Sequence, residues 1–295
     1  MKNGSSRFTP SEIITLIYAC LTGLLACIFW GKPDNPIQLL IFRAAVIAAI
    51  FGVSELNKHF SNKLIWFVRN LGPLALVGYW YPETYQLGKC ILPNLDYIFV
   101  AADQWLFCCQ PSMEFSKLVP YTWFNELMNF SYLTYFAMII ATSLFLFFTN
   151  QPLSQKTTFI IFCSFIFYYV IFIILPVAGP QFYFQYPDNS LPDAGVFREL
   201  LKFVQQTGEQ PTGAFPSSHV GICLINLALL YKYARKGFYI LLPIAILLIC
   251  STVYIKAHYL IDVVAGFATA PLIYWLSLTC WKRFEKSNSL VEKIS

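Results

Sequence analysis

Three long runs without a charged residue constrain the fold of this chain more than any other feature. No Asp, Glu, Lys or Arg occurs from Ile13 to Gly31, from Leu127 to Gln155 or from Thr157 to Pro187. About 20 apolar residues cross the hydrocarbon core of a bilayer as an α-helix, and helix is required because lipid cannot satisfy backbone polar groups. The sequence therefore predicts an all-α, polytopic transmembrane helix bundle.

Eight segments are apolar and long enough to be membrane spans, although Arg43 and Arg69 interrupt the second and third. An arginine near a helix end usually extends to the interface, but Arg43 lies deep enough to reach inward toward a site instead. We expect N-terminal helices and a first outer segment over residues 1–120, and a catalytic bundle over 121–295 that completes a six-helix core. The spans are roughly 13–30, 37–56, 64–81, 127–149, 158–178, 217–234, 238–255 and 259–280.

The distribution of Lys and Arg predicts the orientation in the membrane. With the N-terminus in the cytoplasm, the inner segments hold twelve Lys and Arg residues and the outer segments six. Cytoplasmic loops carry such an excess, so both termini are predicted to be cytoplasmic, in a bacterial inner membrane. The positive net charge reflects topology, and no nucleic-acid partner is expected.

Two long segments, about 82–126 and 179–216, are predicted to lie outside the membrane. Each contains a short amphipathic stretch, Leu95–Phe107 and Val196–Val204, which either controls lipid access to a site or only closes the bundle. A disulfide from Cys90 to Cys108 or Cys109 remains open. No Cys or His spacing indicates a metal site, so no metal or cofactor is expected.

Two of the three histidines are predicted to meet at the outer face. His219 and His258 are 39 residues apart, which is the length of two spans and a short loop. A helix that crosses the bilayer and another that returns bring the chain back to the same face. Asp262 follows His258 by four residues. If the last span begins near His258, the two side chains share one helical face, where a carboxylate can fix the imidazole tautomer. Asp262 could instead only cap or pair at the interface.

The residues before His219 predict a helix N-terminus. Pro216, Ser217 and Ser218 precede an apolar run, and Pro and Ser are typical of the first positions of a helix. The free amides and the positive end of the dipole make such a terminus a site for phosphate. The alternative is an ordinary helix cap without a ligand.

These residues resemble the second and third signatures of the type 2 phosphatidic acid phosphatase superfamily. The second is Pro216-Ser217-Ser218-His219, and the third is Ser251-Thr252, five further residues, His258, three residues and Asp262. This superfamily includes lipid phosphate phosphatases, vanadium haloperoxidases, and the sphingomyelin and inositol phosphorylceramide synthases. The resemblance covers about residues 158–275.

The resemblance implies a mechanism without a cofactor. His258 would attack phosphorus and form a phosphohistidine, and Asp262 would orient it. His219 would protonate the leaving oxygen and then activate the acceptor. Ser217, Ser218 and the amides after Pro216 would hold the phosphate oxygens.

The phosphate-binding cations of the superfamily are missing from their usual places. Thr252 stands where an arginine usually follows the serine of the third signature, and Gly179-Pro180-Gln181 is the remnant of the first signature. Gln181 would then be a neutral phosphate donor. Lys256 could replace a cation, with Arg198 and Lys202 in the facing segment, or could be an interfacial lysine in contact with lipid headgroups.

Three functions remain open from the sequence. Hydrolysis of a membrane lipid phosphoester at the outer face is the leading hypothesis, and headgroup transfer between lipids is the alternative. The missing cations favour a singly charged diester and transfer, whereas the Pro-Ser-Ser-His form favours hydrolysis. A non-catalytic membrane scaffold that kept its histidines is a third class. The sequence names neither the lipid nor the oligomeric state.

Overall fold

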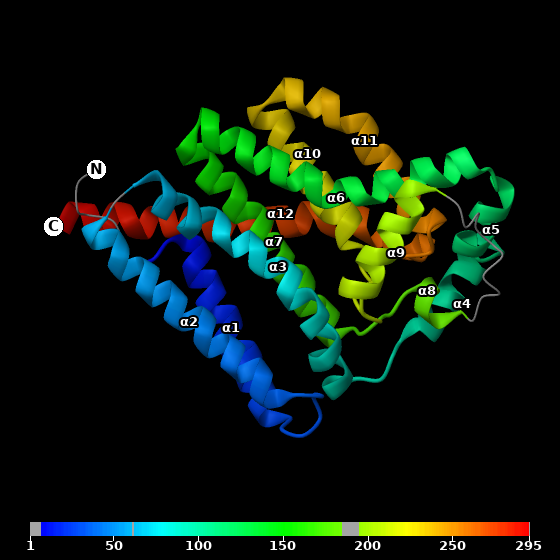
Figure 1. Ribbon diagram of the computed structural model, residues 1–295, viewed down its shortest axis with the longest axis horizontal. Helices are drawn as coiled ribbons and strands as arrows, with labels where there is room; N and C mark the ends of the chain where they lie inside the picture. The colour runs from blue at the N-terminus through cyan, green and yellow to red at the C-terminus, as the bar shows by residue number, and fades with distance from the viewer. Residues whose placement is uncertain (1–6, 61, 185–194, 295) are drawn as a thin grey trace.

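The computed structural model describes residues 7–60, 62–184 and 195–294, and these residues form helices and short connections without a strand (Figure 1). The all-α bundle predicted from the sequence is confirmed. The helices are α1 (Pro10–Ile28), α2 (Pro36–His59), α3 (Lys63–Ile91), α4 (Asp96–Phe107), α5 (Pro111–Leu118), α6 (Thr122–Thr149), α7 (Gln151–Ile174), α8 (Pro180–Tyr183), α9 (Val196–Gly208), α10 (Ser218–Tyr233), α11 (Arg235–Tyr254) and α12 (Leu260–Ile294).

Each of the eight predicted spans falls on a helix. Six of these helices, namely α1, α2, α6, α7, α11 and the part of α12 up to Ser287, are long and apolar enough to cross a membrane. The other two depart from the simple pattern, because α10 has only 16 residues and α3 contains Arg69, Glu83 and Lys89. The chain is thus a multi-pass membrane protein by the length and composition of its helices.

Helix α7 lies at the centre of the bundle. Of the 18 most apolar consecutive residues of α7, 78% are buried inside the protein. The corresponding share in α2, which lies at the edge, is 22%. Helices α3, α6, α10 and α12 all pack against α7 (Figure 1). Large apolar side chains such as Leu21, Phe148 and Trp275 are exposed on the outer helices. Such a surface fits lipid rather than water.

The ends of the long helices gather on two opposite sides of the molecule. The α6–α7 and α10–α11 connections and the end of α12 lie toward the upper left of Figure 1. The short helices α4, α5, α8 and α9 lie on the right. The predicted amphipathic stretches in the two outer segments are confirmed as α4 and α9. Cys90, Cys108 and Cys109 are free thiols, so the disulfide that the sequence left open is not formed.

Arg43 points into the protein and not to the interface. Its side chain is 3% exposed, and its Nη2 lies 2.9 Å from Oε2 of Glu83 on α3. It also donates to the Thr22 hydroxyl and to the Leu39 carbonyl. The inward alternative holds for this arginine, but its partner is Glu83 and not the histidine site.

Arg69 makes a second buried ion pair, with Glu12 on α1. The two side chains are 2.7 Å apart and nearly inaccessible, so the expectation that Arg69 extends to the interface is wrong. Glu12 also completes a capping box with Thr9 at the start of α1. An unpaired charge would be costly at this depth, and the pairs explain how charged residues are tolerated in α2 and α3.

The Arg43–Glu83 pair gives a stability prediction. We expect Arg43→Met to destabilise the protein by about 3–5 kcal/mol, because Glu83 would stay buried without a counter-charge. The double variant Arg43→Met/Glu83→Leu should recover most of this loss. Thermal unfolding in detergent measures both, with Lys58→Met at the exposed Lys58–Glu55 pair as the control. Equal destabilisation by the single and double variants would contradict the coupling.

Candidate active site

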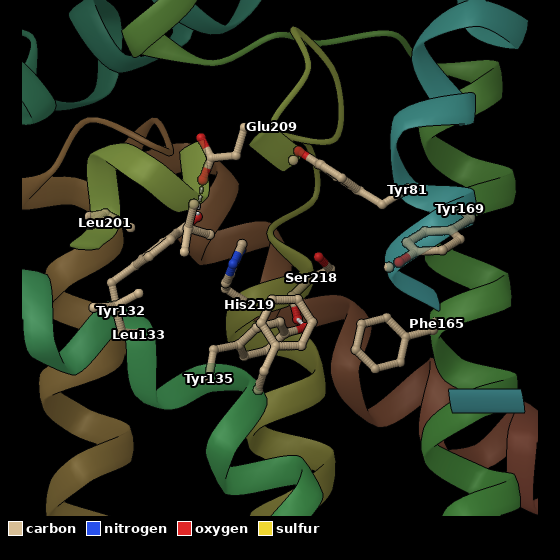
Figure 2. A pocket seen from close by; sticks show the side chains of 14 residues that line it. Tyr81, Tyr132, Leu133, Tyr135, Phe165, Tyr169, Leu201, Glu209, Ser218 and His219 are labelled. Carbon is tan, nitrogen blue, oxygen red and sulfur yellow. Dashed lines mark hydrogen bonds between the residues drawn. The ribbon is translucent and has the colours of Figure 1, made fainter. Parts of the chain in front are cut away.

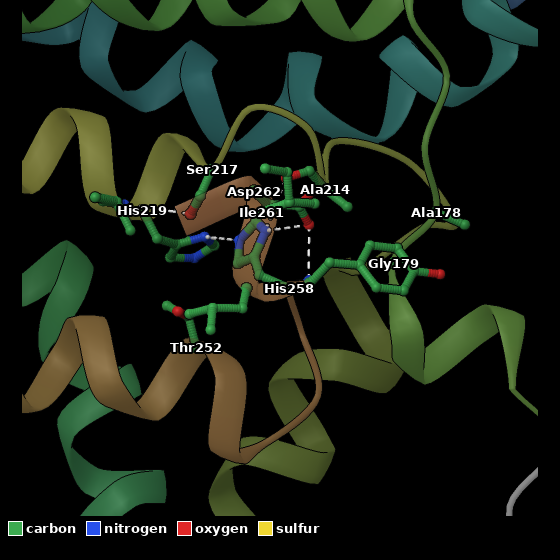
Figure 3. Close-up of polar contacts among 12 residues, drawn as sticks. Ala178, Gly179, Ala214, Ser217, His219, Thr252, His258, Ile261 and Asp262 are labelled. Carbon is green, nitrogen blue, oxygen red and sulfur yellow. Dashed lines mark hydrogen bonds and ion pairs between the residues drawn. The ribbon is translucent and has the colours of Figure 1, made fainter. Parts of the chain in front are cut away.

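His219 and His258 meet across the bundle, as predicted from the two spans and the short loop that separate them. Nδ1 of His219, in the first turn of α10, lies 3.1 Å from Nε2 of His258 in the α11–α12 connection (Figure 3). His258 is 2% exposed, whereas His219 is half-buried and faces a cavity. The third histidine, His59, ends α2 and is exposed.

A backbone carbonyl fixes the tautomer of His258. Nδ1 of His258 lies 2.8 Å from the Ala214 carbonyl oxygen, which can only accept, so this nitrogen carries the proton. Nε2 then presents its lone pair, and His219 donates to it through Nδ1. Burial lowers the pKa of His258 to about 4, so the ring is neutral at pH 7. A neutral imidazole with a free lone pair is the form that can act as a nucleophile.

Asp262 stands behind His258 and also caps α12. Its Oδ2 lies 3.5 Å from Nδ1 of His258, farther than the Ala214 carbonyl. The same oxygen accepts a 2.8 Å hydrogen bond from the backbone N–H of Tyr259. Orientation of His258 and a capping role were alternatives for Asp262 in the sequence, and the structure contains a contact of each kind. The Ala214 carbonyl is a partner that no side-chain pattern reveals.

The start of α10 offers unused donors next to the histidines. Ser217 is the N-cap, and its hydroxyl accepts from the Val220 N–H, which confirms the predicted helix N-terminus. Among the described residues, the amides of Ser218 and His219 donate to no protein acceptor. Such amides at the positive end of a helix favour an anion.

Helices α10 and α12 approach closely at the site. The Ser217 N–H donates to the Asp262 carbonyl oxygen at 3.1 Å. A Cβ on Gly266 would lie 2.9 Å from the Ser217 carbonyl oxygen and 2.8 Å from Cβ of Val220, so only glycine fits there. This close approach holds the two signature segments together.

Two buried aspartates of α4 support the site, although no role was predicted for either of them. Asp103 accepts from the N–H groups of Leu260 and Ile261 at 3.0 and 2.9 Å and so caps α12. Asp96 accepts from the N–H groups of Ala178 and Gly179 at 2.6 and 2.8 Å. The two acids are seven residues apart on one face of α4, and this spacing was the available signal.

Two predicted phosphate ligands, Thr252 and Gln181, make hydrogen bonds within the protein. The Thr252 hydroxyl donates to the Ile249 carbonyl, and the Thr252 carbonyl accepts from the His258 N–H. The Gln181 side-chain amide donates to Glu209 at 2.7 Å and accepts from Gln205 at 2.9 Å. These contacts use the groups that were expected to hold phosphate.

Lys256 is buried and does not lie as a free side chain among lipid headgroups. It is 3% exposed, and its backbone carbonyl accepts from the Gln181 N–H. Burial, with repulsion from Arg198 and Lys117, lowers the pKa of Lys256 to about 8. Within the described residues, no hydrogen bond or ion pair joins Lys256 to either histidine.

A cavity of about 360 Å³ opens beside His219 and contains a residue that the sequence did not single out (Figure 2). Glu209 follows α9 and lies in the cavity wall near His219. Its carboxylate accepts from Tyr132, Gln181 and Gln205. No motif marks this position, because its three partners come from three helices, α6, α8 and α9.

The α4 contacts give a prediction about the site scaffold. We expect Asp103→Ala to destabilise the protein by about 2–4 kcal/mol, because two amides at the start of α12 lose their acceptor. Hydrogen–deuterium exchange should be faster at Leu260 and Ile261, with Glu114→Ala as the control on an exposed α5 pair. Unchanged exchange at these amides would contradict the scaffold role.

Comparison with known proteins agrees with this geometry. The PAP2 superfamily matches the chain over residues 98–276, which is more than half of its length. No curated protein and no solved structure matches. The matched region contains both histidines, Asp262, and the scaffold residue Asp103. The chain therefore belongs to the PAP2 superfamily.

Proposed function

We propose that this protein hydrolyses a membrane lipid phosphoester at the outer face of the membrane through a phosphohistidine at His258. The observation that carries the proposal is the contact between Nδ1 of His219 and Nε2 of His258, with Nδ1 of His258 bound to the Ala214 carbonyl. This arrangement supplies a neutral nucleophile and a proton donor that face each other. Membership of the superfamily supports phosphoester chemistry.

The reaction uses the two histidines in alternate roles. The substrate phosphorus enters between the two nitrogens and replaces the hydrogen bond that joins them. Nε2 of His258 then forms a bond to phosphorus, the bond to the lipid oxygen breaks, and His219 gives that oxygen its proton. In the second step His219 takes a proton from water, whose oxygen attacks phosphorus and releases His258. Asp262 stabilises the charge that develops on His258.

The start of α10 would hold the phosphate oxygens. Within the part of the chain that the structure describes, the amides of Ser218 and His219 have no protein acceptor, and the Ser217 hydroxyl can donate its proton. Donors placed where charge develops supply much of the stabilisation of the transition state. Neutral donors suit a singly charged phosphodiester better than a doubly charged monoester.

Headgroup transfer is the second candidate, and the lack of a described cation at the histidines favours it. Transfer shares every step up to the phosphohistidine, after which a lipid or polyol hydroxyl replaces water. Purified protein incubated with lipid monoesters and diesters, with and without diacylglycerol or ceramide, separates the two. Release of a water-soluble phosphate product supports hydrolysis, and a new headgroup-bearing lipid supports transfer.

The phosphohistidine gives a direct prediction. With a lipid labelled at phosphorus and a rapid quench, we expect acid-labile label on His258. His258→Ala should remove the label and lower turnover by about a thousandfold or more, because the nucleophile is lost. His59→Ala is the matched control and should keep full activity, since His59 is exposed at the end of α2. Turnover that survives His258→Ala would reject His258 as the nucleophile, and the absence of turnover in the wild type would support the scaffold alternative.

The orientation gives a separate prediction. We propose that both termini are cytoplasmic and that the site opens to the periplasm of a bacterial cell, because the basic clusters lie at the opposite end from the histidines. In a Cys108→Ser/Cys109→Ser background, an impermeant thiol reagent should label Glu114→Cys on α5 in intact cells. It should not label Lys236→Cys at the start of α11. Labelling at position 236 instead of 114 would reverse the topology.

A further inference from the structure

The cavity beside His219 has a wall made mainly of aromatic rings. Its described lining comes from α3, α6, α7, α9 and α10 and their connections, and Figure 2 shows the rings around a central space. His219 belongs to the same ring system, because its ring lies 4.7 Å from that of Tyr132 and 4.3 Å from that of Tyr135. The cavity therefore adjoins the proposed reaction centre. Its tyrosines are Tyr81, Tyr132, Tyr135 and Tyr169.

All four tyrosine hydroxyls are already bound to protein acceptors. Tyr81 donates to the Thr212 carbonyl at 2.9 Å, and Tyr169 donates to the Val77 carbonyl at 2.9 Å. Tyr135 donates to the Ser218 carbonyl at 3.3 Å, and Tyr132 donates to Glu209 at 3.3 Å. These bonds fix the rings in place. What remains for a ligand is ring surface rather than hydroxyl groups.

Glu209 is the acidic residue among the described residues of the wall, and no Lys or Arg accompanies it there. Its hydrogen-bond donors are Gln181, Gln205 and Tyr132, which are all neutral. Burial raises the pKa of Glu209, while these hydrogen bonds lower it. Among the described residues no Lys or Arg forms an ion pair with this carboxylate, and its negative charge repels a phosphate dianion. A ligand that brings a positive charge would satisfy it.

We propose that this cavity binds the trimethylammonium group of a choline-type phosphodiester lipid whose phosphate lies at His258. A cation over aromatic faces is attracted by the ring quadrupoles, and quaternary ammonium groups are bound by cages of this kind. The inference rests on the proposed function and names its substrate class. It also accounts for the scarcity of cations, because a zwitterionic diester brings its own positive charge.

A primary ammonium group fits the cavity less well. Such a group has three N–H donors and needs acceptors for each of them. The described wall offers the carboxylate of Glu209, whose oxygens already accept three hydrogen bonds. A trimethylammonium group has no N–H to satisfy and presents methyl groups to the rings.

An acyl chain has a better place nearby. A second cavity of about 290 Å³ lies between α3, α6 and α7 and shares Phe136 and Phe165 with the first. Its described lining is apolar except for Ser143. A hydrocarbon chain avoids the Glu209 carboxylate there. The two cavities thus separate a charged headgroup from a chain.

The reaction of such a lipid balances without a further reactant. The bond from phosphorus to the diacylglycerol oxygen breaks as the bond to Nε2 of His258 forms, and His219 protonates the leaving oxygen. Water then releases phosphocholine from His258. The choline ester bond stays intact, so the headgroup can remain in the cavity through both steps.

The test compares diester lipids with identical acyl chains and choline, ethanolamine or glycerol headgroups. We expect wild-type kcat/KM for the choline lipid to exceed that for the glycerol lipid by about tenfold or more. Glu209→Gln keeps the size of the side chain and should lower kcat/KM for the choline lipid by a larger factor than kcat/KM for the glycerol lipid, so that the preference is lost. Tyr81→Leu should lower turnover of the choline lipid, whereas the matched control Tyr81→Phe keeps the ring and should retain the preference.

Two results would overturn the assignment. The first is a failure to discriminate between the choline and glycerol lipids. The wild type would then turn over both lipids equally, or Glu209→Gln would lower turnover of both by the same factor, as expected of a structural residue. The second is a preference for ethanolamine over choline. If no lipid is cleaved, the proposed function fails, and a binding measurement then tests the choline assignment of the cavity separately. Folded His258→Ala protein should then still bind a single-chain choline phosphodiester more tightly than its glycerol counterpart, and equal binding rejects the cage.

Discussion

The arrangement of the site depends on one backbone hydrogen bond, which runs from the Ser217 N–H to the Asp262 carbonyl and joins the two halves of the site. It ties the start of α10 to the first turn of α12, and Gly266 allows the helices to come that close. Because the two helix starts are locked together, His219 meets His258 without any covalent link. The Ala214 carbonyl then sets the tautomer of His258, so backbone rather than side-chain groups prepare the nucleophile.

The sequence was sufficient for features that follow from periodicity and span length. The helical class, the start of α10 and the meeting of His219 with His258 all follow from helix geometry and bilayer thickness. It was not sufficient for Asp103, Glu209 or the Ala214 carbonyl, whose roles depend on contacts between distant segments. Gln181 and Thr252 were expected to face phosphate because of their motif positions. A motif position does not show that a protein neighbour, such as Glu209 for Gln181 or the Ile249 carbonyl for Thr252, already accepts the hydrogen bond.

Charge is handled differently in the two halves of the molecule. In the N-terminal helices each buried acid faces an arginine, as in the pairs Arg43–Glu83 and Arg69–Glu12. Around the site the buried acids Asp96 and Asp103 and the half-buried Glu209 instead accept from backbone or neutral side-chain donors. Arginine pairs neutralise charge within the protein and are structural in this fold. Neutral donors leave the negative electrostatic potential of the acid in place, and this potential can attract a positively charged ligand.

The hydrogen bonds of Tyr81 and Thr84 with Thr212 have a consequence for what the superfamily signatures indicate. Both residues belong to α3, which lies before the region shared with the superfamily, whereas Thr212 lies within it. One wall of the cavity beside His219 therefore comes from a helix that the superfamily match does not cover. The signatures contain the proposed reacting groups but not this wall, so they bear more directly on the chemistry of this chain than on the lipid that its cavity accepts.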